Sequence, residues 1–240
     1  MPKLTIDNRE VEAREGSTIL EAAKEVGIEI PTFCYNEGVS AYGACRLCSV
    51  EIVKRGKSRV VASCLYPVEE GLVVRTNTER IMNIRKMIAE LLLARCPNVK
   101  IVKDLARQMG VTKPRFKLED NECTLCGLCV RACQEVVGAS AISFVNRGTG
   151  REVETPFQVE SDKCIGCGAC VFVCPTEAIK LEDIGRVREI KKWHASQELQ
   201  KCKVCGRYFA PKVQLNFVAE KSGVPRETFE VCETCRQMKK

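Results

Sequence analysis

Several ingredients of catalysis are missing from this 240-residue sequence. It holds one histidine, His194, and no nucleophile with an accompanying base can be recognised. No glycine-rich fingerprint for a nucleotide stands between a predicted strand and a predicted helix. No extended domain for NADH, flavin or an active-site hydrogen cluster is recognisable either. We therefore expect no substrate chemistry from this chain alone.

Long apolar segments are missing too. No stretch approaches the ~18 apolar residues of a membrane-spanning helix, and residues 1–7 lack the apolar region of a secretory signal. Seventeen cysteines would suggest disulfides in a secreted protein, but here they fall at metal-ligand spacings. We therefore expect no membrane span and a location in the reducing cytoplasm, in an anaerobe or microaerobe.

The positive charge of the chain is confined to one end. The formal charge is +7, and residues 186–240 alone contain 13 Lys and Arg against 6 Asp and Glu. Each oxidised four-cysteine metal site would add a charge of about −2, which brings the loaded protein near neutrality. We therefore expect a solvated face or a docking patch for an acidic subunit, and no nucleic-acid partner.

Two matched cysteine runs dominate the middle of the chain. Each reads C-x2-C-x2-C-x3-C, and together they comprise Cys123, Cys126, Cys129, Cys133, Cys164, Cys167, Cys170 and Cys174. This is the spacing of bacterial-type ferredoxins with two [4Fe–4S] clusters, in which the fourth cysteine of each run binds the other cluster. Disulfides or two zinc sites would not require such matched runs.

The spacing therefore assigns two ligand sets. Cluster A is assigned to Cys123, Cys126, Cys129 and Cys174, and cluster B to Cys164, Cys167, Cys170 and Cys133. Three glycines inside the runs, Gly127, Gly166 and Gly168, are expected where the backbone approaches a cluster closely and where φ is positive. Residues 111–183 form this predicted two-cluster domain.

Residues 1–77 predict a small β-grasp domain. Strands are expected at Lys3–Ile6 and Arg9–Arg14, and Thr18 with Glu21 forms a capping box that opens a helix. Four cysteines follow at C-x10-C-x2-C-x15-C, namely Cys34, Cys45, Cys48 and Cys64. Such a set can hold a [2Fe–2S] cluster with two thiolates per iron, although its first gap is longer than in plant-type ferredoxins. A zinc site is the alternative.

Residues 78–110 predict a helical connector. Ile81, Ile84, Ile88, Leu91 and Leu92 recur at helical spacing and predict one buried face.

At this point a resemblance to a known family is clear. The chain resembles the N-terminal module of the large iron–sulfur subunit of NADH:quinone oxidoreductase (complex I). The same module occurs in the diaphorase iron–sulfur subunit of NAD-reducing hydrogenases, in NAD-linked formate dehydrogenases and in multi-cluster [FeFe]-hydrogenases. The resemblance covers residues 1–183 and is carried by Phe33-Cys34-Tyr35, Gly43-Ala44-Cys45-Arg46-Leu47-Cys48, Ala62-Ser63-Cys64 and Glu70–Thr76.

One departure from that family concerns the connector. The family carries a further [4Fe–4S] cluster with one histidine ligand after the apolar helix. Here Leu91–Arg95 runs directly into Cys96-Pro97, with no histidine nearby. We therefore expect that cluster to be absent and Cys96 to be a buried free thiol.

The C-terminal part contains four further cysteines. Residues 184–200 read as a polar, helix-compatible linker, in which Trp193 and His194 are expected to be packing or surface residues. Residues 201–240 then hold two C-x2-C knuckles, formed by Cys202, Cys205, Cys232 and Cys235. These predict a zinc-ribbon-like unit with one Zn²⁺, and the alternatives are a single rubredoxin-like iron or another [4Fe–4S] cluster.

The sequence thus predicts an α+β chain with one [2Fe–2S] cluster, two [4Fe–4S] clusters and one zinc ion. The resemblance implies a non-catalytic electron-relay subunit of a cytoplasmic NAD(P)-linked oxidoreductase of hydrogenase or formate dehydrogenase type. Its implied partners are a flavin- and NAD(P)H-binding subunit, a small [2Fe–2S] subunit and a catalytic subunit, in an assembly that could also bifurcate electrons. A free-standing multi-cluster ferredoxin and a redox-sensing regulator are the alternative functions.

Overall fold

The computed structural model describes residues 1–238. The chain divides into two compact units, Met1–Cys126 and Gly127–Lys240, and each is described by itself. The boundary falls inside the predicted two-cluster domain. The predicted C-terminal unit runs to residue 240, so its last two residues lie outside the described part.

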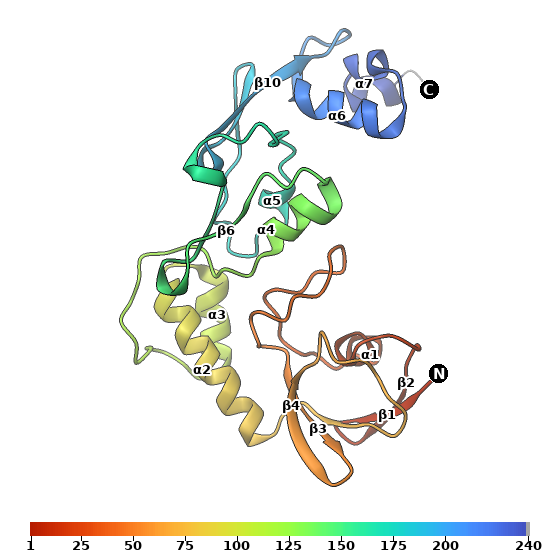
Figure 1. Ribbon diagram of the computed structural model, residues 1–240, viewed down its shortest axis with the longest axis vertical. Coiled ribbons are helices and arrows are strands. Elements are labelled where there is room, and N and C mark those ends of the chain that lie inside the picture. Colours follow the sequence, from red (N-terminus) through yellow and green to blue (C-terminus); the bar gives the residue numbers. More distant parts are fainter. Residues whose placement is uncertain (239–240) are drawn as a thin grey trace. The chain divides into compact units, whose positions relative to one another are not determined.

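A five-stranded sheet with one helix forms the first part of the N-terminal unit (Figure 1). The strand order is β2-β1-β5-β3-β4, with β1 and β5 parallel and the other neighbouring pairs antiparallel. Its elements are β1 (Lys3–Ile6), β2 (Arg9–Glu12), α1 (Ile19–Glu25), β3 (Ser49–Lys54), β4 (Lys57–Ala62) and β5 (Val73–Arg75). A parallel pair flanked by hairpins with a helix between them is the predicted β-grasp arrangement.

Local sequence accounts for how this sheet begins. Asp7 and Asn8 both have positive φ, 47° and 67°, which suits the tight turn between β1 and β2. The Asp7 carboxylate then accepts a hydrogen bond from the Thr76 backbone N–H at 2.7 Å, and so joins the ends of β1 and β5. The capping box is present: Thr18 Oγ1 accepts from the Glu21 N–H, and Glu21 accepts from the Thr18 N–H.

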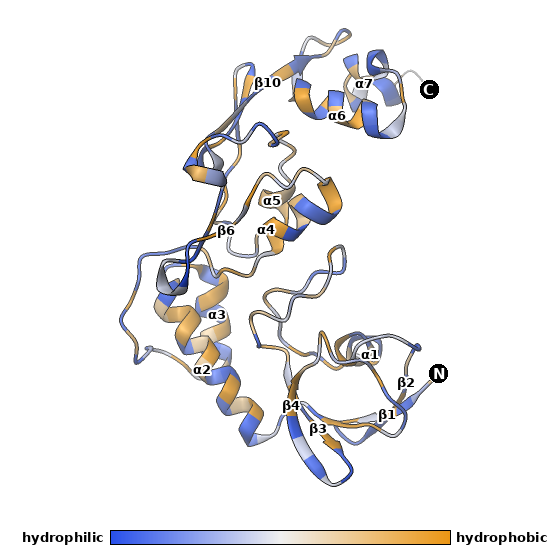
Figure 2. Cartoon of the chain, viewed as in Figure 1, coloured by the Kyte–Doolittle hydropathy of each residue, from blue (hydrophilic) through white to orange (hydrophobic). Residues whose placement is uncertain are grey.

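Two helices follow the sheet, α2 (Glu79–Arg95) and α3 (Lys100–Gln108). Figure 2 shows hydrophobic and hydrophilic residues mixed along α2. The buried face of α2 differs from the predicted one, because Leu91 is 50% exposed. Its buried residues are Ile81, Arg85, Ala89, Glu90, Leu93 and Ala94. The buried face of α2 therefore includes the i, i+4 series Ile81, Arg85, Ala89 and Leu93, in which Arg85 is charged. A search for regularly spaced apolar residues does not find such a face.

The helices share a core with the loop that carries the first cysteines. Phe33 and Leu47, each next to a cysteine in sequence, are buried with Ala89 and Val102 of the two helices. Cys96 belongs to the same cluster and is fully buried, as predicted. The packing of α2 and α3 therefore supports the cysteine loop from one side.

The second unit begins with short helices and a hairpin. These elements are α4 (Leu128–Arg131), the π-helical turn η1 (Ala132–Val137), β6 (Ser143–Val145), the turn η2 (Gly148–Gly150), β7 (Glu152–Glu154), the turn η3 (Pro156–Gln158) and α5 (Ala169–Phe172). β6 and β7 pair antiparallel around Gly148 and Gly150.

The predicted linker over residues 184–200 is wrong. These residues form strands of a four-stranded antiparallel sheet in the order β11-β10-β9-β8. The elements are β8 (Glu182–Ile184), β9 (Val187–Ile190), the turn η4 (Lys191–Trp193), β10 (Ala195–Lys201) and β11 (Tyr208–Pro211). The segment looks polar because only two residues of β10, Ala195 and Leu199, are buried, and its other residues are half-buried or exposed.

Three helical elements complete the described chain: α6 (Lys212–Ser222), the turn η5 (Arg226–Glu230) and α7 (Glu233–Gln237). Leu215 is the buried residue of α6. The core beside it consists of Cys202, Cys232 and Cys235 with Phe209 and Val231 packed against them. The cysteines themselves therefore form much of the interior of this small unit.

Candidate iron–sulfur and metal sites

The four N-terminal cysteines form two close pairs. Cys34 Sγ lies 3.4 Å from Cys45 Sγ, and Cys48 Sγ lies 3.3 Å from Cys64 Sγ. Cys34, Cys48 and Cys64 are buried, and Cys45 is half-buried. The set supplies four sulfur donors in two groups of two, which fits a [2Fe–2S] cluster whose irons each take two thiolates.

Backbone N–H groups donate to these sulfurs. The Phe33 N–H donates to Cys45 Sγ and the Cys45 N–H to Cys34 Sγ, both at 3.4 Å. The hydrogen bond shared with Cys34 lowers the pKa of Cys45 to about 5, and the one shared with Cys64 lowers the pKa of Cys48 to about 7. The same hydrogen bonds, with burial, raise the pKa of Cys34 and of Cys64. In each pair, one sulfur therefore ionises more easily than the other.

Arg85 is a charged residue of this site that the sequence analysis missed. The residue is 3% exposed, and its guanidinium donates to two carbonyls, Leu47 O at 3.0 Å and Ser49 O at 2.9 Å. These carbonyls flank Cys48 in the chain. Burial lowers the pKa of Arg85, and the nearby Cys48 charge opposes that shift. A fixed positive charge thus holds the backbone on both sides of a predicted ligand.

The predicted cluster B ligands lie around one cavity. Cys133, Cys164, Cys167 and Cys170 all line it, together with Ile190 and Trp193. The Ala141 N–H donates to Cys133 Sγ at 3.3 Å, and the Trp193 indole N–H donates to Cys170 Sγ at 3.3 Å. Burial raises the pKa of Cys170 to about 12, and the indole hydrogen bond opposes this shift. Four sulfurs around a cavity with N–H donors fit a [4Fe–4S] cluster.

The predicted cluster A ligands fall in different units. Cys123 and Cys126 belong to the last residues of the first unit, whereas Cys129 and Cys174 belong to the second unit. Locally, the Leu125 N–H donates to Cys123 Sγ at 3.4 Å, and Leu125 has a φ of 55°. The three glycines of the runs have the expected positive φ, 71° at Gly127, 64° at Gly166 and 78° at Gly168. The assignment of cluster A continues to depend on the spacing of its cysteines.

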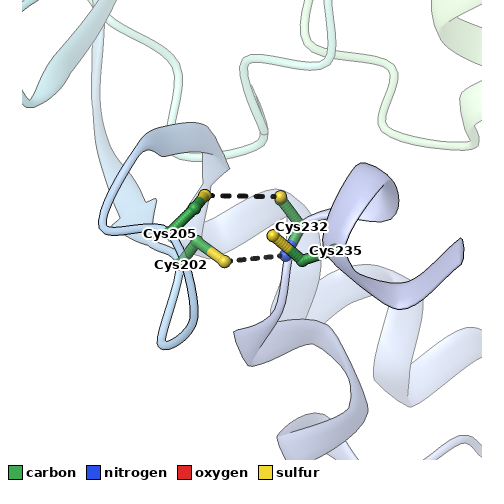
Figure 3. A group of neighbouring side chains, drawn as sticks. All are labelled: Cys202, Cys205, Cys232 and Cys235. Atoms are coloured by element: carbon green, nitrogen blue, oxygen red, sulfur yellow. Dashed lines mark hydrogen bonds between the residues drawn. The ribbon is translucent and has the colours of Figure 1, made fainter. Parts of the chain in front are cut away.

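The four C-terminal cysteines bring their sulfurs together in one compact group (Figure 3). All four Sγ atoms lie within 4.8 Å of one another, and Cys205 Sγ lies 3.8 Å from Cys232 Sγ. Tetrahedral Zn–S bonds of ~2.3 Å place sulfurs about 3.8 Å apart. A cubane cluster binds each thiolate to a different iron and holds the sulfurs further apart, so this geometry fits a single ion.

Hydrogen bonds prepare these sulfurs for a cation. The Cys232 N–H donates to Cys202 Sγ at 3.3 Å, and the Val204 N–H does so at 3.4 Å. The Cys232 N–H is the largest cause that lowers the pKa of Cys202, to about 6. Arg207 reaches Cys232 Sγ at 3.8 Å and donates to Thr234 Oγ1 at 3.2 Å. These donors favour the thiolate form of Cys202, and thiolates are the ligands that zinc or a single iron needs. The hydrogen bond with Cys232 instead raises the pKa of Cys235 to about 12.

Comparison with known families locates both kinds of cluster domain. The family described as a 2Fe-2S iron-sulfur cluster binding domain matches residues 2–79. A family described as a 4Fe-4S dicluster domain matches residues 116–181, and a second family of the same description matches residues 163–210. The last match includes Cys202 and Cys205 of the C-terminal cluster.

Comparison with curated proteins finds oxidoreductase subunits that are similar to this chain. The chain is 34% identical to an NADH-quinone oxidoreductase subunit of Rhizobium meliloti over 75% of its length, which is 24% of that protein. It is 36% identical to NADPH-Fe(3+) oxidoreductase subunit alpha of Geobacter sulfurreducens over 65% of its length, 21% of that protein. The chain is therefore similar in sequence to one part of each of these oxidoreductase subunits.

This iron–sulfur chain spans about a quarter of the length of the curated relatives that it matches. Among solved structures, it aligns with a chain of an NAD⁺-reducing [NiFe]-hydrogenase in the H2-reduced state, with a TM-score of 0.60 and 24% identity. The alignment covers 89% of this chain and 93% of that one, and it shows a shared fold. Across the described residues, no helix has the length and apolar character to cross a bilayer.

Proposed function

We propose that this chain is a non-catalytic electron-relay subunit of a cytoplasmic NAD(P)-linked multisubunit oxidoreductase. The observation that carries the proposal is that homology to such subunits coincides with three separate groups of sulfur ligands. A chain with this inventory stores and passes single electrons, and the substrate chemistry belongs to its partners. The relatives are named for NADH and NADPH oxidoreductases, which supports a nicotinamide as one end of the path.

The proposed cofactors are one [2Fe–2S] cluster, two [4Fe–4S] clusters and one zinc ion. The first would be held by Cys34, Cys45, Cys48 and Cys64, whose sulfurs lie in two pairs. Cluster B would be held by the four cysteines that line the second-unit cavity. Cluster A would take Cys123, Cys126, Cys129 and Cys174 by spacing, and zinc would take the compact C-terminal set.

The clusters supply one-electron oxidation and reduction when bound. The residues of the chain contribute thiolate ligands, N–H donors to those thiolates and burial, and these three factors set reduction potentials in iron–sulfur proteins. The proposed partners are a flavin- and NAD(P)H-binding subunit, a small [2Fe–2S] subunit and a catalytic subunit of hydrogenase or formate dehydrogenase type. Four of the five predicted segments, 1–77, 78–110, 111–183 and 201–240, remain the proposed division by role. Residues 184–200, predicted as a linker, contribute strands to the four-stranded sheet instead.

Anaerobic purification from the native host tests this function. Mass spectrometry should identify a flavin-binding subunit and a catalytic oxidoreductase subunit that co-purify with the chain in fixed proportion. Metal analysis should give about ten irons and about one zinc per chain. A protein that is recovered alone as a monomer, and that unrelated reductases reduce rapidly, would instead favour a free-standing ferredoxin.

A further inference from the structure

Trp193 is the single tryptophan of the chain, and it lies outside both cysteine runs. It ends the turn η4 between β9 and β10, and it is 1% exposed. The sequence predicts a packing residue here, and burial agrees with that. Its position beside the cluster B ligands, however, gives it a second contact that packing alone does not require.

The indole N–H of Trp193 donates to Cys170 Sγ at 3.3 Å. An indole nitrogen can only donate, and a buried one normally needs an acceptor. The acceptor here is the sulfur of a proposed cluster ligand, itself 9% exposed. The other N–H donor to a cluster B sulfur described above comes from the backbone, at Ala141. Trp193 therefore supplies a side-chain donor that substitution can remove without altering a peptide group.

The surrounding sheet holds Trp193 in place. Ile190 pairs with Ala195 across the hairpin that contains the turn, and both residues are buried. On β9, Arg188 donates to the carbonyl of Gly166 at 3.3 Å and forms an ion pair with Asp183. The hairpin that carries Trp193 is thus attached to the loop that contains Cys164 and Cys167.

A hydrogen bond to a ligating sulfur stabilises negative charge on that sulfur. Reduction adds an electron to a cluster, so the reduced state gains more from the bond than the oxidised state does. Hydrogen bonds to the sulfurs and exclusion of solvent are two of the factors that set the potentials of such clusters. Trp193 combines both effects, because it is a buried residue that lines the cavity with the four cysteines and its N–H donates to Cys170 Sγ.

From this geometry we propose that Trp193 is a positioning residue that raises the reduction potential of the cluster held by Cys133, Cys164, Cys167 and Cys170, through its N–H···S bond to Cys170. The inference depends on the proposed ligand set for cluster B. It assigns a redox role to the β9–β10 hairpin, which lies after the second cysteine run.

The single tryptophan permits an atomic test. In a tryptophan-auxotrophic host, tryptophan is replaced by benzothienylalanine, which keeps the ring shape but has sulfur in place of N–H. The matched control is 5-fluorotryptophan, which keeps the N–H. Redox titration of the whole anaerobic protein, followed by electron paramagnetic resonance, compares the potentials of all clusters. Signals that change in a Cys170→Ser variant identify cluster B.

We expect benzothienylalanine to lower the equilibrium constant for reduction of cluster B roughly tenfold, about 59 mV for a one-electron couple. The potentials of the other clusters and of the fluorotryptophan protein should stay unchanged. Trp193→Phe should give the same direction of shift. Tryptophan labelled with ¹⁵N at the indole should show hyperfine coupling to reduced cluster B.

The outcomes separate this inference from the proposed function. The role of Trp193 alone would be overturned if the benzothienylalanine protein kept two intact [4Fe–4S] clusters and an unchanged cluster B potential. It would also be overturned if the labelled protein kept both clusters and showed no ¹⁵N coupling. If the Cys170→Ser variant kept both [4Fe–4S] clusters unaltered, Cys170 would not be a cluster ligand. The inference about Trp193 would then be overturned, whereas the proposed relay function would stand. An equal shift in all clusters would show a general structural effect and would also overturn the inference.

Discussion

Replacing Arg85 with methionine should destabilise the N-terminal unit and lower the reduction potential of its cluster. Methionine keeps most of the side-chain length and removes the guanidinium. The variant loses two hydrogen bonds to buried carbonyls, those of Leu47 and Ser49, and each unpaired group costs ~1–3 kcal/mol. The desolvation cost of the buried charge disappears too and offsets part of this loss. The net destabilisation should be about 2 kcal/mol.

The assay compares thermal unfolding of anaerobic protein with a matched control on the same helix. For a unit of this size, 1 kcal/mol corresponds to roughly 4 °C in Tm, so Arg85→Met should lower Tm by about 8 °C. Arg80→Met removes an exposed arginine that lies 3.8 Å from Glu51, and exposed pairs contribute under ~1 kcal/mol. Equal shifts in the two variants would refute the reasoning, as would an unchanged [2Fe–2S] potential in Arg85→Met.

Three further predictions concern other parts of the chain. Burial raises the pKa of Cys96 from 9.0 to about 11. The stability that the buried neutral thiol contributes is therefore complete below pH 9 and is lost as the pH rises through 11. In thermal melts at alkaline pH, Cys96→Ala should not show this loss of stability, and the variant should keep its full iron content. Cys235→Ala should lose the zinc ion and keep about ten irons, whereas a fall of about four irons would assign a cluster to that site. Gly166→Ala places a Cβ 3.1 Å from side-chain carbons of Gln197 and Pro211, so it should lower both iron occupancy and Tm. The control Gly185→Ala has a similar φ but open space around the new Cβ, and it should cost only about 1 kcal/mol of stability. Equal effects of the two variants would show that backbone strain, and not the close contact, causes the loss.

The sequence alone predicted the parts of this protein that depend on local spacing. A cluster needs thiolates at intervals that one tight loop can present, so the two C-x2-C-x2-C-x3-C runs point to their chemistry without a structure. The capping box at Thr18 and the turn at Asp7-Asn8 are local in the same way, because neighbouring residues satisfy the hydrogen bonds. Both the family matches and the structure agree with these predictions.

Only the tertiary structure decided which residues far away in sequence meet the sulfurs. Arg85 lies 37 residues after Cys48, and its charged side chain can be buried because the carbonyls on either side of that cysteine accept its hydrogen bonds. Trp193 lies 23 residues after Cys170, in the turn between β9 and β10, within a segment that the sequence pattern presented as a polar linker. Such contacts arise from packing between elements, and no local pattern encodes them. The cysteine ligands could therefore be predicted from the sequence, whereas the residues that hydrogen-bond to those cysteines or to the backbone around them were found only in the fold.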